Sequence, residues 1–235
     1  MKTSNSILIS QAKESLKGKW GLAIGGYLLF YLITTGIGMV PKIGFVAVLI
    51  VGGPFLLGLQ SLYLSIARNQ DTKIEQIFSG FNSFGKALAA YLLMFLYILL
   101  WMLLFIVPGF IAAFSYSMTF FILVDEPSIG VSEALNKSKQ MMKGNKGKLF
   151  ILILPFIALP MIAFLFYFIL IIVSAVHGDL TAIARHSGFF DTLQGKIVIP
   201  GCTVLMTGLF VWMYVATAKF YDDIKPKDFV NEIEG

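Results

Sequence analysis

The sequence predicts an all-α membrane protein, and the observations behind this prediction are an apolar composition, long apolar runs and a biased distribution of basic residues. The chain has 235 residues, of which 57% are apolar and 13% are charged, whereas soluble domains carry about 25% charged residues. A fold that faces water must cover itself with polar surface, so this composition requires lipid as a solvent. We expect a single integral membrane domain over residues 1–235, because no polar stretch is long enough for a separate core.

Apolar runs of the length that crosses a bilayer, about 20 residues, predict six spanning helices. Their expected bounds are residues 20–40, 43–67, 87–106, 109–124, 149–176 and 197–218. The third and fourth come from one run, residues 87–124, which as a single helix would be roughly 57 Å long. Val107-Pro108-Gly109 interrupts this run, and we predict a tight turn there. The alternative is a flexible break that opens a cavity between the two spans.

The basic residues indicate the orientation of these spans, because cytoplasmic loops of membrane proteins are rich in Lys and Arg. Six spans with both termini in the cytoplasm put 15 of the 18 basic residues inside, and leave only Lys42, Arg185 and Lys196 outside. This predicts a multi-pass protein with cytoplasmic N- and C-termini. The net charge of +5 therefore indicates cytoplasmic loops and not a nucleic-acid partner. We expect the lysines of these loops to contact anionic lipid.

Three cytoplasmic segments show the apolar spacing of amphipathic helices, and each precedes a pair of spans. Their apolar stripes are Leu8, Ala12 and Leu16; Ile74, Ile77, Phe78, Phe81 and Phe84; and Val131, Ala134, Leu135, Met141 and Met142. The pattern predicts three repeats of an interfacial helix followed by a two-span hairpin. Each interfacial helix either lies in the headgroup layer or packs on the ends of the spans. Each hairpin ends in a polar patch: Arg68-Asn69-Gln70-Asp71, Asp125-Glu126 and Asp222-Asp223.

The six predicted spans contain no charged residue and no histidine, which argues against proton relays, ion pathways and intramembrane hydrolysis. We therefore predict no catalytic residue, no cofactor site and no metal site. Both histidines, His177 and His186, fall in the outer segment 177–196, and two ligands without a second cluster make a poor metal site. Gln60 is expected to form an interhelical hydrogen bond, and the pair Gly21 and Gly25 is expected to pack closely against a helix of this chain or of a second copy.

The middle of the chain resembles a known family. Val107, Pro108 and Gly109, then Tyr116, Ser117 and Met118, and then Asp125 and Pro127 match DUF975, a family of uncharacterised bacterial membrane proteins. The match continues through Ser138, Met142 and Gly144, and Phe220-Tyr221-Asp222 resembles the end of the family. The family is distantly similar to the membrane portion attached to some glycerophosphodiester phosphodiesterases. The resemblance implies a six-span helical fold and a bacterial plasma membrane, and it implies no catalytic residue.

The function that these observations favour is non-enzymatic. We expect an accessory or scaffold protein that interacts with lipids or with another membrane protein. The alternative is a permease or channel-like protein for an apolar or amphiphilic substrate, which would not require charges inside the spans.

Overall fold

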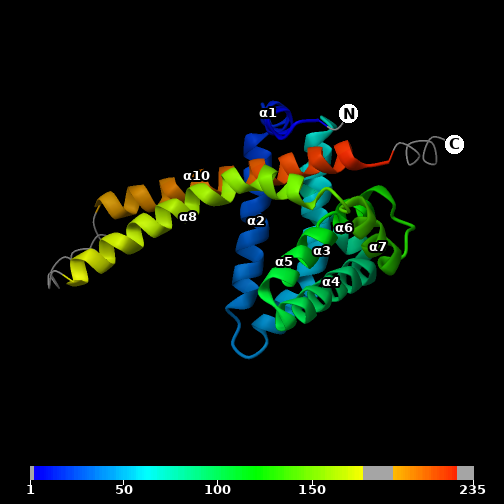
Figure 1. Ribbon diagram of the computed structural model, residues 1–235, viewed down its shortest axis with the longest axis horizontal. Coiled ribbons are helices and arrows are strands. Elements are labelled where there is room, and N and C mark those ends of the chain that lie inside the picture. Colours follow the sequence, from blue (N-terminus) through cyan, green and yellow to red (C-terminus); the bar gives the residue numbers. More distant parts are fainter. Residues whose placement is uncertain (1–2, 177–192, 227–235) are drawn as a thin grey trace. The chain divides into compact units, whose positions relative to one another are not determined.

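The computed structural model describes residues 3–176 and 193–226, and every regular element in these residues is a helix (Figure 1). The predicted all-α fold is therefore confirmed. Contacts divide the chain into two compact units, Met1–Leu152 with Val211–Gly235, and Ile153–Phe210. The helices are α1 (Asn5–Ser15), α2 (Trp20–Gly38), α3 (Gly44–Ala67), the 3-10 helix η1 (Ile74–Ser83), α4 (Phe84–Leu104), α5 (Ile106–Tyr116), α6 (Thr119–Asp125), α7 (Val131–Met141), α8 (Lys146–Val176) and α10 (Leu193–Ile224).

Several of these helices are long and apolar enough to cross a membrane. Within the described residues there are five, or six if the pair of α7 with the start of α8, bent by 87°, forms one span. They are Trp20–Gly38, Gly44–Ala67, Ile74–Leu104, Ile106–Asp125 and Val204–Ile224. The membrane class of the fold is thus supported, while six crossings with a fixed orientation stay a prediction.

Residues 74–83 differ from the amphipathic α-helix that their spacing predicted, because they form a 3-10 helix that continues directly into α4. In a 3-10 helix, residues three apart lie on one edge. One edge carries Ile77 and Gly80, which are buried, while the other carries Phe78, Phe81 and Phe84, whose rings follow one another at 6.4 and 6.3 Å between centroids. The segment therefore packs along α3, and together with α4 it forms a helix long and apolar enough to span a membrane.

Glycines explain how closely η1 and α3 approach. A Cβ atom added to Gly58 of α3 would overlap the carbonyl group of Ile77, and one added to Gly80 of η1 would overlap the carbonyl oxygen of Pro54. By contrast, an added Cβ at Gly21 meets open space, and one at Gly25 makes only an ordinary contact of 3.7 Å with Ile74. Among the described residues, close backbone contact therefore occurs at glycines of α3 and η1 and not at Gly21 or Gly25. Contact of Gly21 with a second copy stays a prediction.

The turn between the third and fourth predicted spans lies two residues earlier than expected. Phe105 has an extended backbone (φ −159°, ψ 147°) between α4 and α5, while Val107, Pro108 and Gly109 form the first turn of α5. Proline is tolerated in a first turn because its missing N–H would have no helical partner there. A Cβ at Gly109 would overlap Met102 of α4, so this glycine allows the two helices of the hairpin to pack closely.

The first and third predicted repeats share the same geometry at their start. Helices α1 and α7 are both 11 residues long, and each is followed at the same spacing by a glycine in the left-handed region, Gly18 (φ 74°) and Gly144 (φ 78°). The apolar stripes of both helices are buried against other helices of the chain. Of the two predicted positions for these helices, the structure therefore supports packing on the spans. The second repeat differs, because η1 replaces its short α-helix.

The second unit contains α8 from Ile153 and α10 up to Phe210. Two prolines, Pro155 and Pro160, lie inside α8. The described side chains of this part of α8 are apolar, and several are strongly exposed, among them Met161 (64%) and Ile162 (65%). An apolar helix surface of this kind suits contact with lipid.

Candidate functional site

A cluster of charged side chains joins the ends of three helices of the first unit. Arg68 follows α3, Asp125 is the last residue of α6, and Asp222 lies near the end of α10. The Arg68 guanidinium donates from Nη1 to Asp125 Oδ1 at 2.7 Å and from Nη2 to Asp125 Oδ2 at 2.9 Å. It also donates from Nη2 to Asp222 Oδ1 at 2.6 Å. One arginine therefore binds two carboxylates, and the planar guanidinium is well suited to such paired contacts.

Asp125 lies at the centre of this cluster, and its side chain is only 6% exposed. Its Oδ2 atom also accepts hydrogen bonds from Lys225 Nζ at 2.7 Å and from the Tyr221 hydroxyl at 3.0 Å. The two basic and two acidic groups balance in formal charge. Burial would lower the pKa of Arg68, but its hydrogen bonds to Asp125 and Asp222 outweigh burial and raise that pKa above its ordinary value. The guanidinium therefore stays charged.

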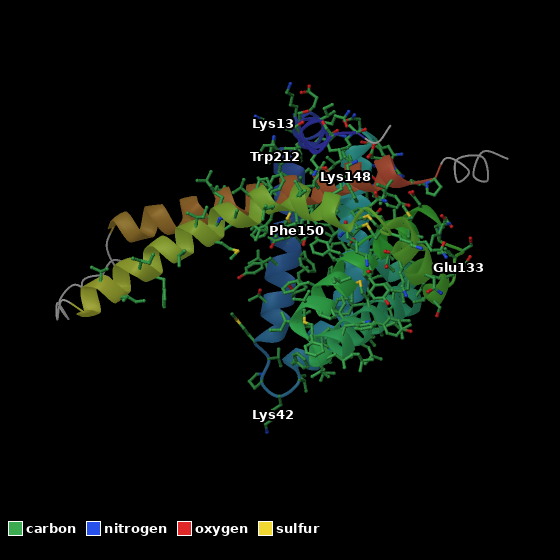
Figure 2. All side chains as sticks on the ribbon, in the orientation of Figure 1. Lys13, Lys42, Glu133, Lys148, Phe150 and Trp212 are labelled. Carbon is green, nitrogen blue, oxygen red and sulfur yellow. The ribbon has the colours of Figure 1, made fainter. Side chains whose placement is uncertain are left out.

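A second polar contact ties the chain near its beginning to α8 and α10. Asp223 accepts hydrogen bonds through Oδ1 from the Thr3 amide at 3.0 Å and from the Thr3 hydroxyl at 2.6 Å. Its Oδ2 atom accepts one from Lys148 Nζ at 2.7 Å. Nearby, the Trp212 indole donates to the carbonyl of Ile9 at 3.0 Å, and Lys13 lies over the Trp212 ring (Figure 2). Contacts with Thr3 and with Lys148 thus hold the end of α10 in place.

The family motif around Tyr116, Ser117 and Met118 marks a break between α5 and α6. Ser138 of α7, which is fully buried, reaches into this break. Its hydroxyl donates to the carbonyl of Ser115 at 2.8 Å and accepts from the Met118 amide at 3.2 Å. Backbone groups that lose their helical partners at a break need such replacements when they are buried. Ser138 therefore holds the break in place.

We expect Ser138→Ala to destabilise the protein by about 1–3 kcal/mol, because a buried amide and a buried carbonyl lose their partner. Ser117→Ala is the matched control, since the Ser117 hydroxyl bonds only to the Phe114 carbonyl one turn earlier, and its removal should change stability by less than about 0.5 kcal/mol. Thermal unfolding of both purified variants in detergent measures the difference. Equal losses would contradict the assigned role of Ser138.

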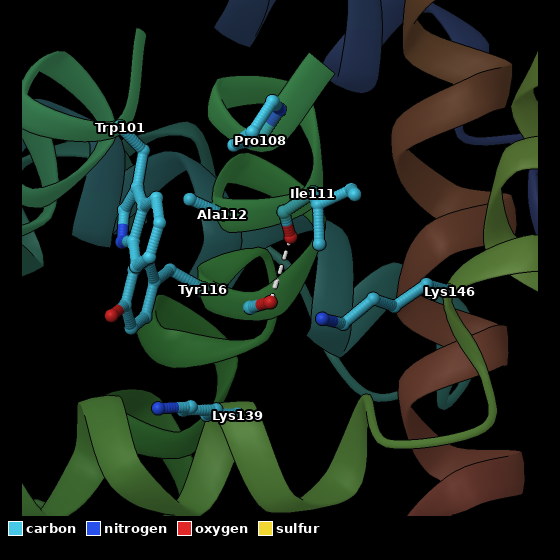
Figure 3. A pocket seen from close by; sticks show the side chains of 8 residues that line it. Trp101, Pro108, Ile111, Ala112, Tyr116, Lys139 and Lys146 are labelled. Atoms are coloured by element: carbon cyan, nitrogen blue, oxygen red, sulfur yellow. Dashed lines mark hydrogen bonds between the residues drawn. The ribbon is translucent and has the colours of Figure 1, made fainter. Parts of the chain in front are cut away.

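A hollow of about 280 Å³ lies beside α5, between α4, α7 and the start of α8. Figure 3 shows Trp101 and Tyr116 on one side of it, and Pro108, Ile111 and Ala112 along α5. Lys139 of α7 and Lys146 of α8 approach its end near Tyr116, away from Pro108. The hollow is therefore apolar at one end and basic at the other. We call it the α5 groove.

A second hollow, of about 490 Å³, adjoins the basic end of the α5 groove. It shares Lys139 and Lys146 with the groove and adds Asn136, Gln140 and Lys143. All five of its lining residues are polar or basic. Together the two hollows place three lysines beside an apolar surface, which is an arrangement suited to an amphiphilic molecule with a negative charge.

Most residues of the predicted family motif lie around these features. Asp125 is in the charged cluster, Ser138 holds the break, and Pro108 and Tyr116 line the α5 groove. The carbonyl of Pro127 accepts a hydrogen bond from Lys86 Nζ, Met142 is fully buried after α7, and Gly144 itself adopts the left-handed conformation, which glycine permits. His177 and His186 lie outside the described residues.

Sequence reasoning missed Arg68, Tyr221 and Lys225 as partners of Asp125. The available signal was positional, since every predicted hairpin ends in a polar patch and Arg68, Asp125 and Asp222 each belong to one. For Gln60, the predicted interhelical hydrogen bond is not formed through its Oε1 atom, which is buried without a partner among the described residues. The buried Tyr63 hydroxyl, one turn along α3, likewise has no partner among those residues.

Comparison with known proteins adds one family. The family model described as "Protein of unknown function (DUF975)" matches residues 1–112 and 103–228. No curated protein and no solved structure matches the chain significantly. The distant similarity to the membrane portion of some glycerophosphodiester phosphodiesterases stays a prediction. Since the matches cover nearly the whole chain, including the break at Ser117, the charged cluster and the α5 groove, the protein belongs to the DUF975 family.

Proposed function

We propose that the protein is a non-enzymatic accessory or scaffold protein of the bacterial plasma membrane, which acts through contact with lipids or with another membrane protein. In this proposal both termini lie in the cytoplasm, because the basic residues concentrate in the segments on that side. The lysine-rich surface of α7 and the start of α8 then faces the headgroups of the inner leaflet.

The observation that supports this proposal best is the pairing of the part-buried charges at the helix ends. Arg68, Asp125, Asp222 and Lys225 neutralise one another and bind the ends of α3, α6 and α10 together. A charged group that moves ions or protons must change its partner or its protonation during the cycle. A fully paired cluster instead suits a fixed cytoplasmic platform on which other molecules assemble.

A permease for an amphiphilic substrate is the second candidate, and the α5 groove favours it. The groove has an apolar wall on two spanning helices and a basic end. A substrate with an apolar tail and an acidic head could follow this path. The two candidates differ in one measurable respect: a permease moves such molecules between leaflets by itself, and a scaffold does not.

The test is reconstitution of the purified full chain into liposomes that contain a tail-labelled fluorescent phospholipid. A membrane-impermeant reductant bleaches only the outer-leaflet label, so the protected fraction reports transfer between leaflets. For a scaffold we expect the same protected half as in protein-free liposomes. Mass spectrometry of gently solubilised protein should then find a retained lipid or a stoichiometric protein partner. Transfer of nearly all the label within minutes would contradict the scaffold proposal and favour the permease.

A further inference from the structure

Three lysines at the α5 groove and the hollow beside it have no acidic partner among the described residues, unlike the neighbouring basic residues. Lys137 pairs with Glu126 and Lys148 pairs with Asp223. Among the ion pairs of residues 3–176 and 193–226, none includes Lys139, Lys143 or Lys146. No acidic side chain lines the groove or the hollow beside it. The basic end therefore carries uncompensated positive charge, which attracts an anion.

The other end of the groove is suited to hydrocarbon. Trp101 and Ile111 are 47% and 49% exposed, and they belong to helices that are long and apolar enough to span a membrane. The wall from Pro108 to Tyr116 covers about 12 Å along α5 at 1.5 Å per residue. Tyr116, near the basic end, is of a residue type that favours the boundary between headgroups and acyl chains. A free anion such as phosphate would leave this wall without a partner.

We propose that the α5 groove binds one anionic phospholipid of the cytoplasmic leaflet. Its phosphate lies between Lys139 and Lys146, its headgroup extends toward Lys143, and the upper part of one acyl chain lies against Trp101 and Ile111. This inference rests on the proposed function and deepens it, because it names the class of lipid and the residues that select it. Selection depends on the headgroup charge, since zwitterionic lipids have the same chains and the same phosphate.

Trp101 provides the measurement, because bromine atoms on acyl chains quench tryptophan fluorescence at short range. The full chain is reconstituted into phosphatidylcholine vesicles that contain a small fraction of phosphatidylglycerol, with brominated chains on one lipid or on the other. The Trp101→Phe variant identifies the part of the signal that comes from Trp101. We expect brominated phosphatidylglycerol to quench this part at fractions where brominated phosphatidylcholine does not.

The variant K139Q/K146Q should weaken the preference for phosphatidylglycerol about 30-fold, from about fivefold for each lysine near an anionic headgroup. The matched control is K17Q/K73Q, which removes two exposed cytoplasmic lysines outside the groove and should retain the preference within about twofold. If the double variant does not fold, K139Q and K146Q are measured singly, each with an expected fivefold loss.

Equal quenching by both brominated lipids would overturn the proposal, and so would an unchanged preference in K139Q/K146Q. An equal loss of preference in the control variant would also overturn it, because it would indicate general attraction by surface charge. Failure of the proposed function is distinguishable from these outcomes. Lipid transfer between leaflets contradicts the scaffold role and leaves the groove assignment intact, whereas loss of the headgroup preference without lipid transfer contradicts the groove assignment alone.

Discussion

Arg68→Gln should destabilise the folded protein by about 3 kcal/mol, the lower end of the cost of removing one partner from a buried ion pair, because the Arg68 side chain keeps 28% of its surface exposed. Asp125, with 6% of its side chain exposed, would keep only Lys225 and Tyr221 as partners, and Asp222 would lose its bond to the guanidinium. The ends of α3, α6 and α10 would then separate more easily. Unfolding by increasing mole fractions of sodium dodecyl sulfate, followed by tryptophan fluorescence, measures the change in free energy.

A double-mutant cycle distinguishes the ion pair from general damage. Asp125→Asn in the Arg68→Gln background should cost less than in the native background, with a coupling energy of about 1–3 kcal/mol between the two positions. Lys17→Gln is the control, because the Lys17–Glu14 pair is 69% exposed on both sides, and it should change stability by less than about 0.5 kcal/mol. Additive effects of Arg68→Gln and Asp125→Asn on stability would contradict the ion pair between these two side chains.

Gly58→Ala should prevent normal packing of α3 against η1 and reduce stability by at least about 3 kcal/mol. The added Cβ would overlap the carbonyl group of Ile77, which is backbone and cannot move aside like the end of a side chain. Inserting an atom into a packed interior commonly costs about 1–3 kcal/mol even when side chains can adjust. The expected result is a lower yield of monodisperse protein in size-exclusion chromatography and a lower unfolding midpoint.

Gly21→Ala is the same chemical change in another spanning helix, and it serves as the control. An added Cβ at Gly21 meets no atom within 4 Å, so alanine should be neutral or should stabilise the helix by about 0.5–1 kcal/mol. The opposite ranking, a tolerated change at Gly58 and a harmful one at Gly21, would mean that Gly21 packs against a second copy of the chain. It would also contradict the close contact of η1 with α3.

The predicted helical membrane class agrees with the structure because it depends on quantities that every residue contributes to, namely apolar content and the length of apolar runs. The starts of the first two long helices follow from the same signal, with α2 at Trp20 and α3 at Gly44. The apolar stripes of α1 and α7 were equally readable, because a period near 3.6 places such residues on one face. Local pattern alone therefore indicated which face of each short helix is buried.

Residues 74–84 show where a local pattern is insufficient. Their apolar spacing suits an α-helix and a 3-10 helix almost equally, and the choice depends on a partner. Gly58 lets the backbone of η1 approach α3, and the period of three then aligns Ile77 and Gly80 along the contact. The spacing of Gly21 and Gly25 likewise predicted a close helix contact, which the structure forms at other glycines. Glycine spacing alone does not specify which helix comes near.

The sequence by itself determined that this chain is a helical membrane protein, where α2 and α3 begin, and that the ends of its predicted hairpins are polar. Only the tertiary structure decided that Arg68, Asp125, Asp222 and Lys225 meet in one cluster and that Lys139 and Lys146 share a groove with Trp101. The physical reason is sequence distance: Arg68 and Asp222 are 154 residues apart, and no local propensity encodes such a pairing. It forms because buried charges are costly unless opposite charges come together.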